Sequence, residues 1–431
     1  QYNKTTDVAK RKEIYKEIPD FGGFLVKANS EGQPGPQNYG RTHADGANML
    51  ADAVAPFNGV VMWRAFVYSN ELPEDRHKQA NLEFEPLDGK FRENVIIQVK
   101  NGAIDFQPRE PFHPLFGKMP QTPLMLELQI TQEYLAPMFK ECLDTDTHLP
   151  AKGNTVAQII DGSTYKQKRT AIAGVANIGS DINWTGHVMA QSNWYAFGRL
   201  AWDHQLSAET IAREWLALSF NTKEIFTNTA LSILMESREA CVNYMTPLGL
   251  HHLMGTGHHY GPAPWVDDLD RADWTPYYYH KATKEGIGFN RTSTGSNAVA
   301  QYAPYWQQQW NNANSTDKKL LLWFHHLPWN YKLKNGDDLW TAICTSYDKG
   351  VKQVRTFIQQ WDSLEKEVDA ERFSQVKMLL KIQEEEARWW RNACLLYFQS
   401  KSGLAFPASI EPPEGSLEYY KSLKFPYAPG N

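Results

Sequence analysis

The sequence has little cysteine, no long apolar run and no excess of positive charge. Its four cysteines lie far apart without any Cys-x-x-Cys pair, so a disulfide framework is not expected. No stretch of about 18 apolar residues occurs, so no membrane-spanning helix is expected either. The net charge of −5 gives no basic field for nucleic acid. With 42% hydrophobic and 22% charged residues, the chain is typical of a globular protein. The cysteines are Cys142, Cys241, Cys344 and Cys394.

The chain also begins without a methionine or an apolar signal region, at Gln1-Tyr2-Asn3-Lys4. Either a leader has been removed or upstream sequence is missing. The compartment therefore stays open between the cytoplasm and the periplasm or the outside of the cell. The length of 431 residues allows two or three domains with a large core.

Aromatic residues are abundant, with 15 tryptophans and an aromatic content of 13%. Aromatic faces stack on sugar rings, which favours a carbohydrate ligand. The alternative is that these large side chains simply fill a core, to which aromatic residues contribute strongly. Composition alone does not decide between the two.

Strand-like apolar runs alternate with helical patterns over the first 205 residues. This alternation, at a spacing of roughly 30–40 residues, predicts parallel α/β structure. The apolar runs begin near residues 24, 59, 95, 123 and 171, and helices are expected near 43–55, 74–82, 134–144 and 187–203. Helical patterns dominate afterwards, at 207–215, 223–243, 316–327, 336–363 and 369–400. We therefore predict an α/β domain over residues 1–205 and a mainly α-helical domain over residues 206–431.

Carboxylates follow three of the predicted strands, at Glu31, Asp105 and Glu133. In a parallel barrel the strand bodies pack, and the residues at their C-terminal tips do the chemistry. Glycoside hydrolysis needs two carboxyl groups, one that donates a proton and one that is ionised. The alternative for each acid is a helix cap or a surface ion pair. Three such acids together, each beside a polar or cationic residue, favour a catalytic site.

Three cations lie on or near the same strands, at Lys27, Arg64 and Lys100. Long cations on buried strands are costly unless they are paired. They either form ion pairs with the three acids or bind the carboxylate of an anionic substrate, for which a planar guanidinium is well suited. The residue types leave both interpretations open.

Histidines cluster in the C-terminal half, at His251, His252, His258 and His259. Their spacing fits no common set of metal ligands, and no cysteine lies nearby. Structural or substrate-lining roles are favoured. A metal-dependent hydrolase remains an alternative function, and so does a non-catalytic carbohydrate-binding protein.

Four segments resemble the α-glucuronidases of glycoside hydrolase family 67. They are residues 23–36 (GFLVKANSEGQPGP), 102–111 (GAIDFQPREP), 129–134 (QITQEY) and 257–262 (GHHYGP). The resemblance runs from about residue 20 to beyond residue 400. It implies a central (β/α)8 barrel, of which this chain holds strands four to eight and lacks strands one to three. It also implies a mostly helical C-terminal domain that often forms a homodimer.

The resemblance also implies an activity and a role for each candidate residue. Family members are inverting enzymes that need no cofactor. They hydrolyse the α-1,2 bond between glucuronic acid, or its 4-O-methyl ether, and the terminal xylose of small acidic xylo-oligosaccharides, the aldouronic acids. By resemblance, Glu31 is the general acid, and Asp105 and Glu133 activate the water. The substrate carboxylate is bound by Lys27, Arg64 and Lys100.

Overall fold

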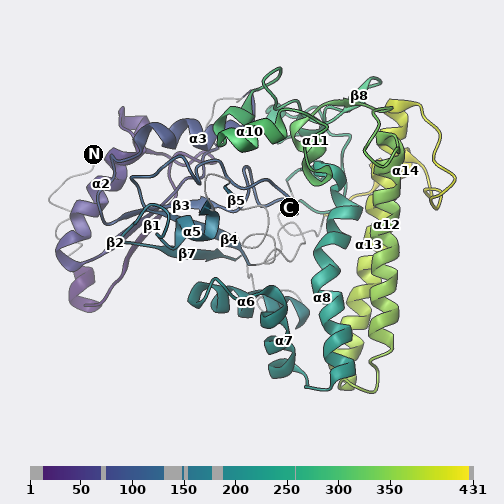
Figure 1. Cartoon of the computed structure of the whole chain (residues 1–431), viewed down its shortest axis with the longest axis horizontal. Helices are drawn as coiled ribbons and strands as arrows, with labels where there is room; N and C mark the ends of the chain where they lie inside the picture. Colours follow the sequence, from purple (N-terminus) through teal and green to yellow (C-terminus); the bar gives the residue numbers. More distant parts are fainter. Residues whose placement is uncertain are drawn as a thin grey trace.

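The computed structural model of the chain describes residues 13–68, 74–130, 148–149, 154–176, 188–257 and 259–426 (Figure 1). Glu133 and Cys142 lie outside these residues, as does the helix expected near 134–144. The other three cysteines, Cys241, Cys344 and Cys394, are buried free thiols. None of the helices in the described part is both long enough and apolar enough to cross a membrane.

All five predicted strands form, and they pair side by side in one parallel sheet. The order β1-β2-β3-β4-β7 follows the sequence, which confirms the α/β prediction. The sheet is curled like half of a barrel, and its two outer strands stay partly exposed. The described residues do not close it into a full barrel. The strands are β1 (Gly23–Val26), β2 (Val60–Arg64), β3 (Val95–Lys100), β4 (Leu124–Gln129) and β7 (Ala171–Val175).

The two faces of the sheet differ in polarity because side chains alternate along each strand. On one face of β2, Val61 and Trp63 are buried, and Trp63 Nε1 donates to His43 Nδ1 of the covering helix α2 at 3.1 Å. On the opposite face, Arg64 and Gln98 both hydrogen-bond to Glu127 of β4. The inner, concave face of the half-barrel is therefore polar at its C-terminal end.

Short elements complete the first half of the chain. Residues 13–17 are helical, and three further helices and a two-stranded antiparallel ladder flank the sheet. They are α2 (His43–Val54), α3 (Gln79–Phe84), α5 (Val156–Ile160), β5 (His148–Leu149) and β6 (Asn154–Thr155). Single 3₁₀ turns connect elements throughout the chain at Pro36–Tyr39, Ala55–Phe57, Arg76–Lys78, Glu85–Leu87, Val188–Ala190, Pro247–Gly249, Ala272–Trp274, Ala298–Gln301 and Lys318–Leu320.

The second half is mainly helical, as predicted, and three long helices stand side by side in it (Figure 1). Aspartate caps begin two of them: Asp338 accepts from the backbone N–H of Thr341, and Asp369 accepts from that of Arg372. The helices are α6 (Gln191–Trp202), α7 (Ala208–Ser219), α8 (Glu224–Met245), α9 (Pro276–His280), α10 (Pro304–Trp310), α11 (Leu321–Phe324), α12 (Leu339–Asp362), α13 (Ala370–Ser402) and α14 (Leu417–Ser422). One short ladder joins β8 (Gly286–Ile287) to β9 (Leu327–Pro328).

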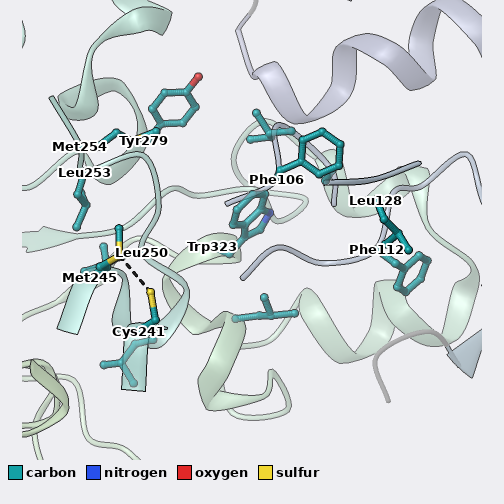
Figure 2. Packing of buried hydrophobic residues seen from close by; sticks show 14 of the residues in the cluster. Phe106, Phe112, Leu128, Cys241, Met245, Leu250, Leu253, Met254, Tyr279 and Trp323 are labelled. Atoms are coloured by element: carbon teal, nitrogen blue, oxygen red, sulfur yellow. Dashed lines mark hydrogen bonds between the residues drawn. The ribbon is translucent and has the colours of Figure 1, made fainter. Parts of the chain in front are cut away.

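The two halves share one hydrophobic core. Figure 2 shows Trp323 between Phe106 and Phe112 of the first half and Leu250 of the second. Trp323 is fully buried, and all four side chains belong to the same cluster. The loops of the helical half are thereby fixed against the C-terminal ends of the parallel strands.

Candidate active site

The predicted acids Glu31 and Asp105 line the same cleft, which has a volume of about 290 Å³. Glu31 lies beyond the end of β1, and Asp105 lies beyond the end of β3. Because parallel strands end at one edge of the sheet, residues 74 positions apart in sequence come together there. The third acid, Glu133, follows β4 but lies outside the described residues.

The backbone at Glu31 is held in an unusual conformation. Its φ of 52° lies in the left-handed region, which costs a non-glycine residue of order 1 kcal/mol or more. The Glu31 N–H donates to the carbonyl oxygen of Tyr68, beyond β2, at 3.2 Å. The Glu31 carboxylate forms an ion pair with Lys27 and remains 53% exposed. The acid is thus anchored through its backbone while its side chain faces the cleft.

Asp105 sits on a loop that is organised by the partly buried carboxyl group of Glu110. The two oxygens of Glu110 accept from the backbone N–H groups of Ile104 at 2.5 Å, Asp105 at 2.8 Å and Gln107 at 2.9 Å. Burial raises the pKa of Glu110 to about 7, although these three donors act in the opposite direction. Gly102 begins the loop with a φ of 101°, and a Cβ there would collide with Glu110.

Replacing Glu110 with glutamine should change how stability depends on pH. The folded pKa lies above the ordinary value of 4.5, so the folded state binds more protons than the unfolded state between those values. The contribution of this carboxyl to the free energy of unfolding is therefore full below about pH 4.5 and is lost as pH rises through about 7. Glutamine cannot titrate. The unfolding free energy of the wild type minus that of Glu110→Gln, measured by denaturant unfolding, should fall between about pH 5 and pH 8.

The exposed residue Glu371 supplies the control for this comparison, since Glu371→Gln removes a carboxyl group from the first turn of α13. If the unfolding free energy of the wild type minus that of Glu110→Gln stays constant or grows over the same pH range, the raised pKa of Glu110 is contradicted.

The three predicted cations converge on the ring of Phe66, just beyond β2. Lys100 Nζ lies 3.3 Å from the ring centroid, Lys27 Nζ lies 5.0 Å from it, and Arg64 Cζ lies 5.4 Å from it. Such distances allow cation–π attraction, which offsets part of the mutual repulsion of the cations. Lys27 contacts Glu31, and Lys100 contacts Asp105, so two of the cations pair with predicted acids.

Arg64 pairs instead with Glu127 in the middle of β4, a residue that sequence reasoning missed. Arg64 Nε donates to one oxygen of Glu127 at 2.7 Å, and Nη2 donates to the other at 2.5 Å. Gln98 Nε2 adds a third hydrogen bond at 2.5 Å. The Glu127 side chain is completely buried. The sequence did hold a signal for Glu127: an acidic residue within an apolar strand requires a buried partner.

The other wall of the cleft comes from the helical half. His252, which the sequence suggested to be structural or substrate-lining, lies in this wall. His259, from the same predicted histidine cluster, and Gly257, from the segment 257–262, also line it. Tyr68 of the first half lines the cleft as well. The other lining residues were not singled out from the sequence. They are Met254, Gly255, Thr256, Leu269, Asp273, Trp274, Pro276 and Tyr279. Among the described residues, no group of three or more His, Cys, Asp or Glu side chains could hold a metal ion.

Comparison with known proteins matches both halves of the chain to one family. The model of the glycosyl hydrolase family 67 middle domain matches residues 6–184, and that of the family 67 C-terminus matches residues 185–411. Alpha-glucuronidase A of Emericella nidulans is 39% identical over 414 residues, covering 91% of this chain and 48% of that protein. Probable alpha-glucuronidases A of Aspergillus fumigatus and Aspergillus clavatus are 39% and 38% identical over 410 residues, with the same coverage. The chain spans about half the length of these curated relatives.

Proposed function

Because the chain belongs to glycosyl hydrolase family 67, we propose that it is part of an α-glucuronidase that releases glucuronic acid from xylan-derived oligosaccharides. One observation carries the proposal beyond family membership: Glu31 and Asp105 line the same cleft, and each contacts one of the cations gathered around Phe66. A site that hydrolyses an acidic glycoside needs both carboxyl groups and a counter-charge for the substrate.

The proposed reaction proceeds with inversion at the anomeric carbon. Glu31 donates a proton to the glycosidic oxygen as the α-1,2 bond to xylose breaks. Asp105, with Glu133, removes a proton from the water that attacks the opposite face of the sugar ring. The base carboxylate takes this proton and stabilises positive charge that develops on the water and the sugar ring only in the transition state, which is how the site lowers the barrier.

The substrate carboxylate is proposed to bind among Lys27, Arg64 and Lys100. Lys27 contacts Glu31, and Lys100 contacts Asp105. A bound glucuronate, methylated or not at O4, would give the cations a new anionic partner.

The finer architecture is also a proposal. We infer that the five strands are strands four to eight of a (β/α)8 barrel, because β1 and β7 are the partly exposed edges of a curled parallel sheet. The division into a barrel part at residues 1–205 and a helical domain at 206–431 is retained as part of this proposal. So is a homodimer formed through the C-terminal domain.

The stereochemistry of the first product tests the function. The protein that contains this chain should convert an aldouronic acid into the β-anomer of glucuronic acid, observed by NMR before mutarotation. Initial release of the α-anomer would contradict inversion. Absence of any hydrolysis would favour the non-catalytic carbohydrate-binding alternative. Activity that is lost on treatment with a chelator and restored by a metal ion would favour the metal-dependent alternative.

A further inference from the structure

A chain of buried hydrogen bonds runs from Asp75 towards the cleft. The Asp75 carboxylate accepts from Arg291 Nε at 3.1 Å and from Ser296 Oγ at 2.6 Å. The Asp75 and Arg291 side chains are both completely buried. Arg291 Nη1 then lies 3.1 Å from His251 Nε2, and His251 Nδ1 lies 2.7 Å from His252 Nδ1.

The chemistry of these groups fixes where each proton sits. A guanidinium only donates, so His251 Nε2 must accept from Arg291. Burial lowers the pKa of His252 to about 3 and that of His251 well below its usual range, and the charge of Arg291 acts in the same direction. Both imidazoles are therefore neutral at neutral pH, each with one proton. His251 holds its proton on Nδ1 and donates it to His252 Nδ1, which leaves the proton of His252 on Nε2.

The Nε2–H group of His252 has no partner among the described residues. The ring is 8% exposed and lines the same cleft as Glu31 and Asp105. Its position is well defined, because it stacks on Tyr279 at 4.0 Å and its backbone N–H donates to Gln107 Oε1 at 2.8 Å. A buried donor without an acceptor costs free energy and requires an explanation.

We propose that His252 is a substrate-binding residue whose Nε2–H donates a hydrogen bond to an uncharged oxygen, a hydroxyl group of the bound saccharide. The inference rests on the proposed function and adds His252 to the residues that bind the substrate. The hydrogen bonds that run from Asp75 to His252 Nδ1 leave Nε2 able only to donate. This atom therefore needs an oxygen acceptor on the ligand. The cations at Phe66 remain available for the carboxylate, and His252 serves a neutral part of the ligand.

Three substitutions separate hydrogen bonding from packing. His252→Phe keeps a ring over Tyr279 but has no donor. His252→Gln is long enough to place an amide N–H near the former Nε2, whereas His252→Asn reaches only the former Nδ1. The φ of 54° at this position favours asparagine over glutamine on backbone grounds, so a purely structural role predicts the better activity for asparagine.

We expect kcat/KM for an aldouronic acid to fall roughly tenfold in His252→Phe and His252→Asn, as for a lost hydrogen bond, and His252→Gln to recover most of it. The proposal would be overturned if kcat/KM of His252→Asn equals or exceeds that of His252→Gln, or if His252→Phe keeps full activity. Failure of the wild type itself to hydrolyse the substrate would contradict the proposed function instead.

A spectroscopic measurement on the wild type does not depend on the variants folding. Nitrogen NMR of histidine-labelled protein should show His252 protonated at Nε2 and unprotonated at Nδ1 near neutral pH. In the Glu31→Gln variant, an aldouronic acid should shift the Nε2 signal while Nδ1 stays unprotonated. A proton on Nδ1, or an Nε2 signal that saturating aldouronic acid leaves unchanged, would refute the assignment.

Discussion

Replacing Glu31 with glutamine should slow hydrolysis of an aldouronic acid by about a hundredfold to ten-thousandfold, the usual contribution of a general acid. Glutamine keeps the size and most of the backbone behaviour of glutamate but has no proton to give the leaving oxygen. Xylose is a poor leaving group, so its departure depends on that proton. In an aryl glucuronide, the activated aryl group departs without a proton from an acid. The loss in kcat should therefore be much smaller for the aryl substrate, measured under the same conditions.

Binding separates this outcome from misfolding. The Glu31→Gln protein should still bind the aldouronic acid, which calorimetry can measure, because Lys27 loses a competing carboxylate. The exposed Glu371→Gln variant should retain wild-type kcat on both substrates. An equal loss on both substrates would exclude the acid role for Glu31.

The sheet could be predicted from the sequence because each strand is a short apolar run between helical patterns, and all five expected strands formed. Their ends were less predictable. The first strand, expected to begin near residue 24, ends already at Val26, and Asn29 and Glu31 then adopt left-handed backbone conformations. A helix was expected at 316–327, yet the chain leaves the helical conformation after Phe324. The Leu327–Pro328 segment pairs with β8 instead, because the residue before proline favours extended backbone.

The strand-end residues of the site were predictable for the same reason as the sheet. The topology of parallel strands alone is enough to bring Glu31 and Asp105 to one edge. The wall from the helical half was not predictable in this way. His252 reaches the cleft through a backbone hydrogen bond to Gln107, 145 residues earlier, and no local pattern encodes such a contact. The pairing of Arg64 with Glu127 was also not predictable from the sequence. The two residues lie on β2 and β4, on either side of β3, and whether they meet depends on the register of all three strands.

Breaking the buried ion pair between Arg64 and Glu127 should lower the stability of the fold. Arg64→Met should lower the free energy of unfolding by about 3–5 kcal/mol, since it leaves the buried carboxylate of Glu127 without its guanidinium. Adding Glu127→Gln should recover much of this loss, because a neutral amide can still accept from Gln98. Denaturant unfolding of both variants measures the two changes. Arg92 provides the matched control: it makes a similar two-point contact with Asp52 on the surface, so Arg92→Met should change stability little.

The folded double variant, Arg64→Met with Glu127→Gln, then isolates the role of Arg64 in binding. If the guanidinium binds the substrate carboxylate, this variant should lose selectivity for a glucuronide over the matching neutral glucoside. The expected loss is roughly tenfold to a hundredfold in the ratio of the two kcat/KM values, as for a hydrogen bond to a charged group. Glu127→Gln alone keeps the cation and should retain that selectivity. Unchanged selectivity in the double variant would restrict Arg64 to a structural role and leave Lys27 and Lys100 to bind the uronate.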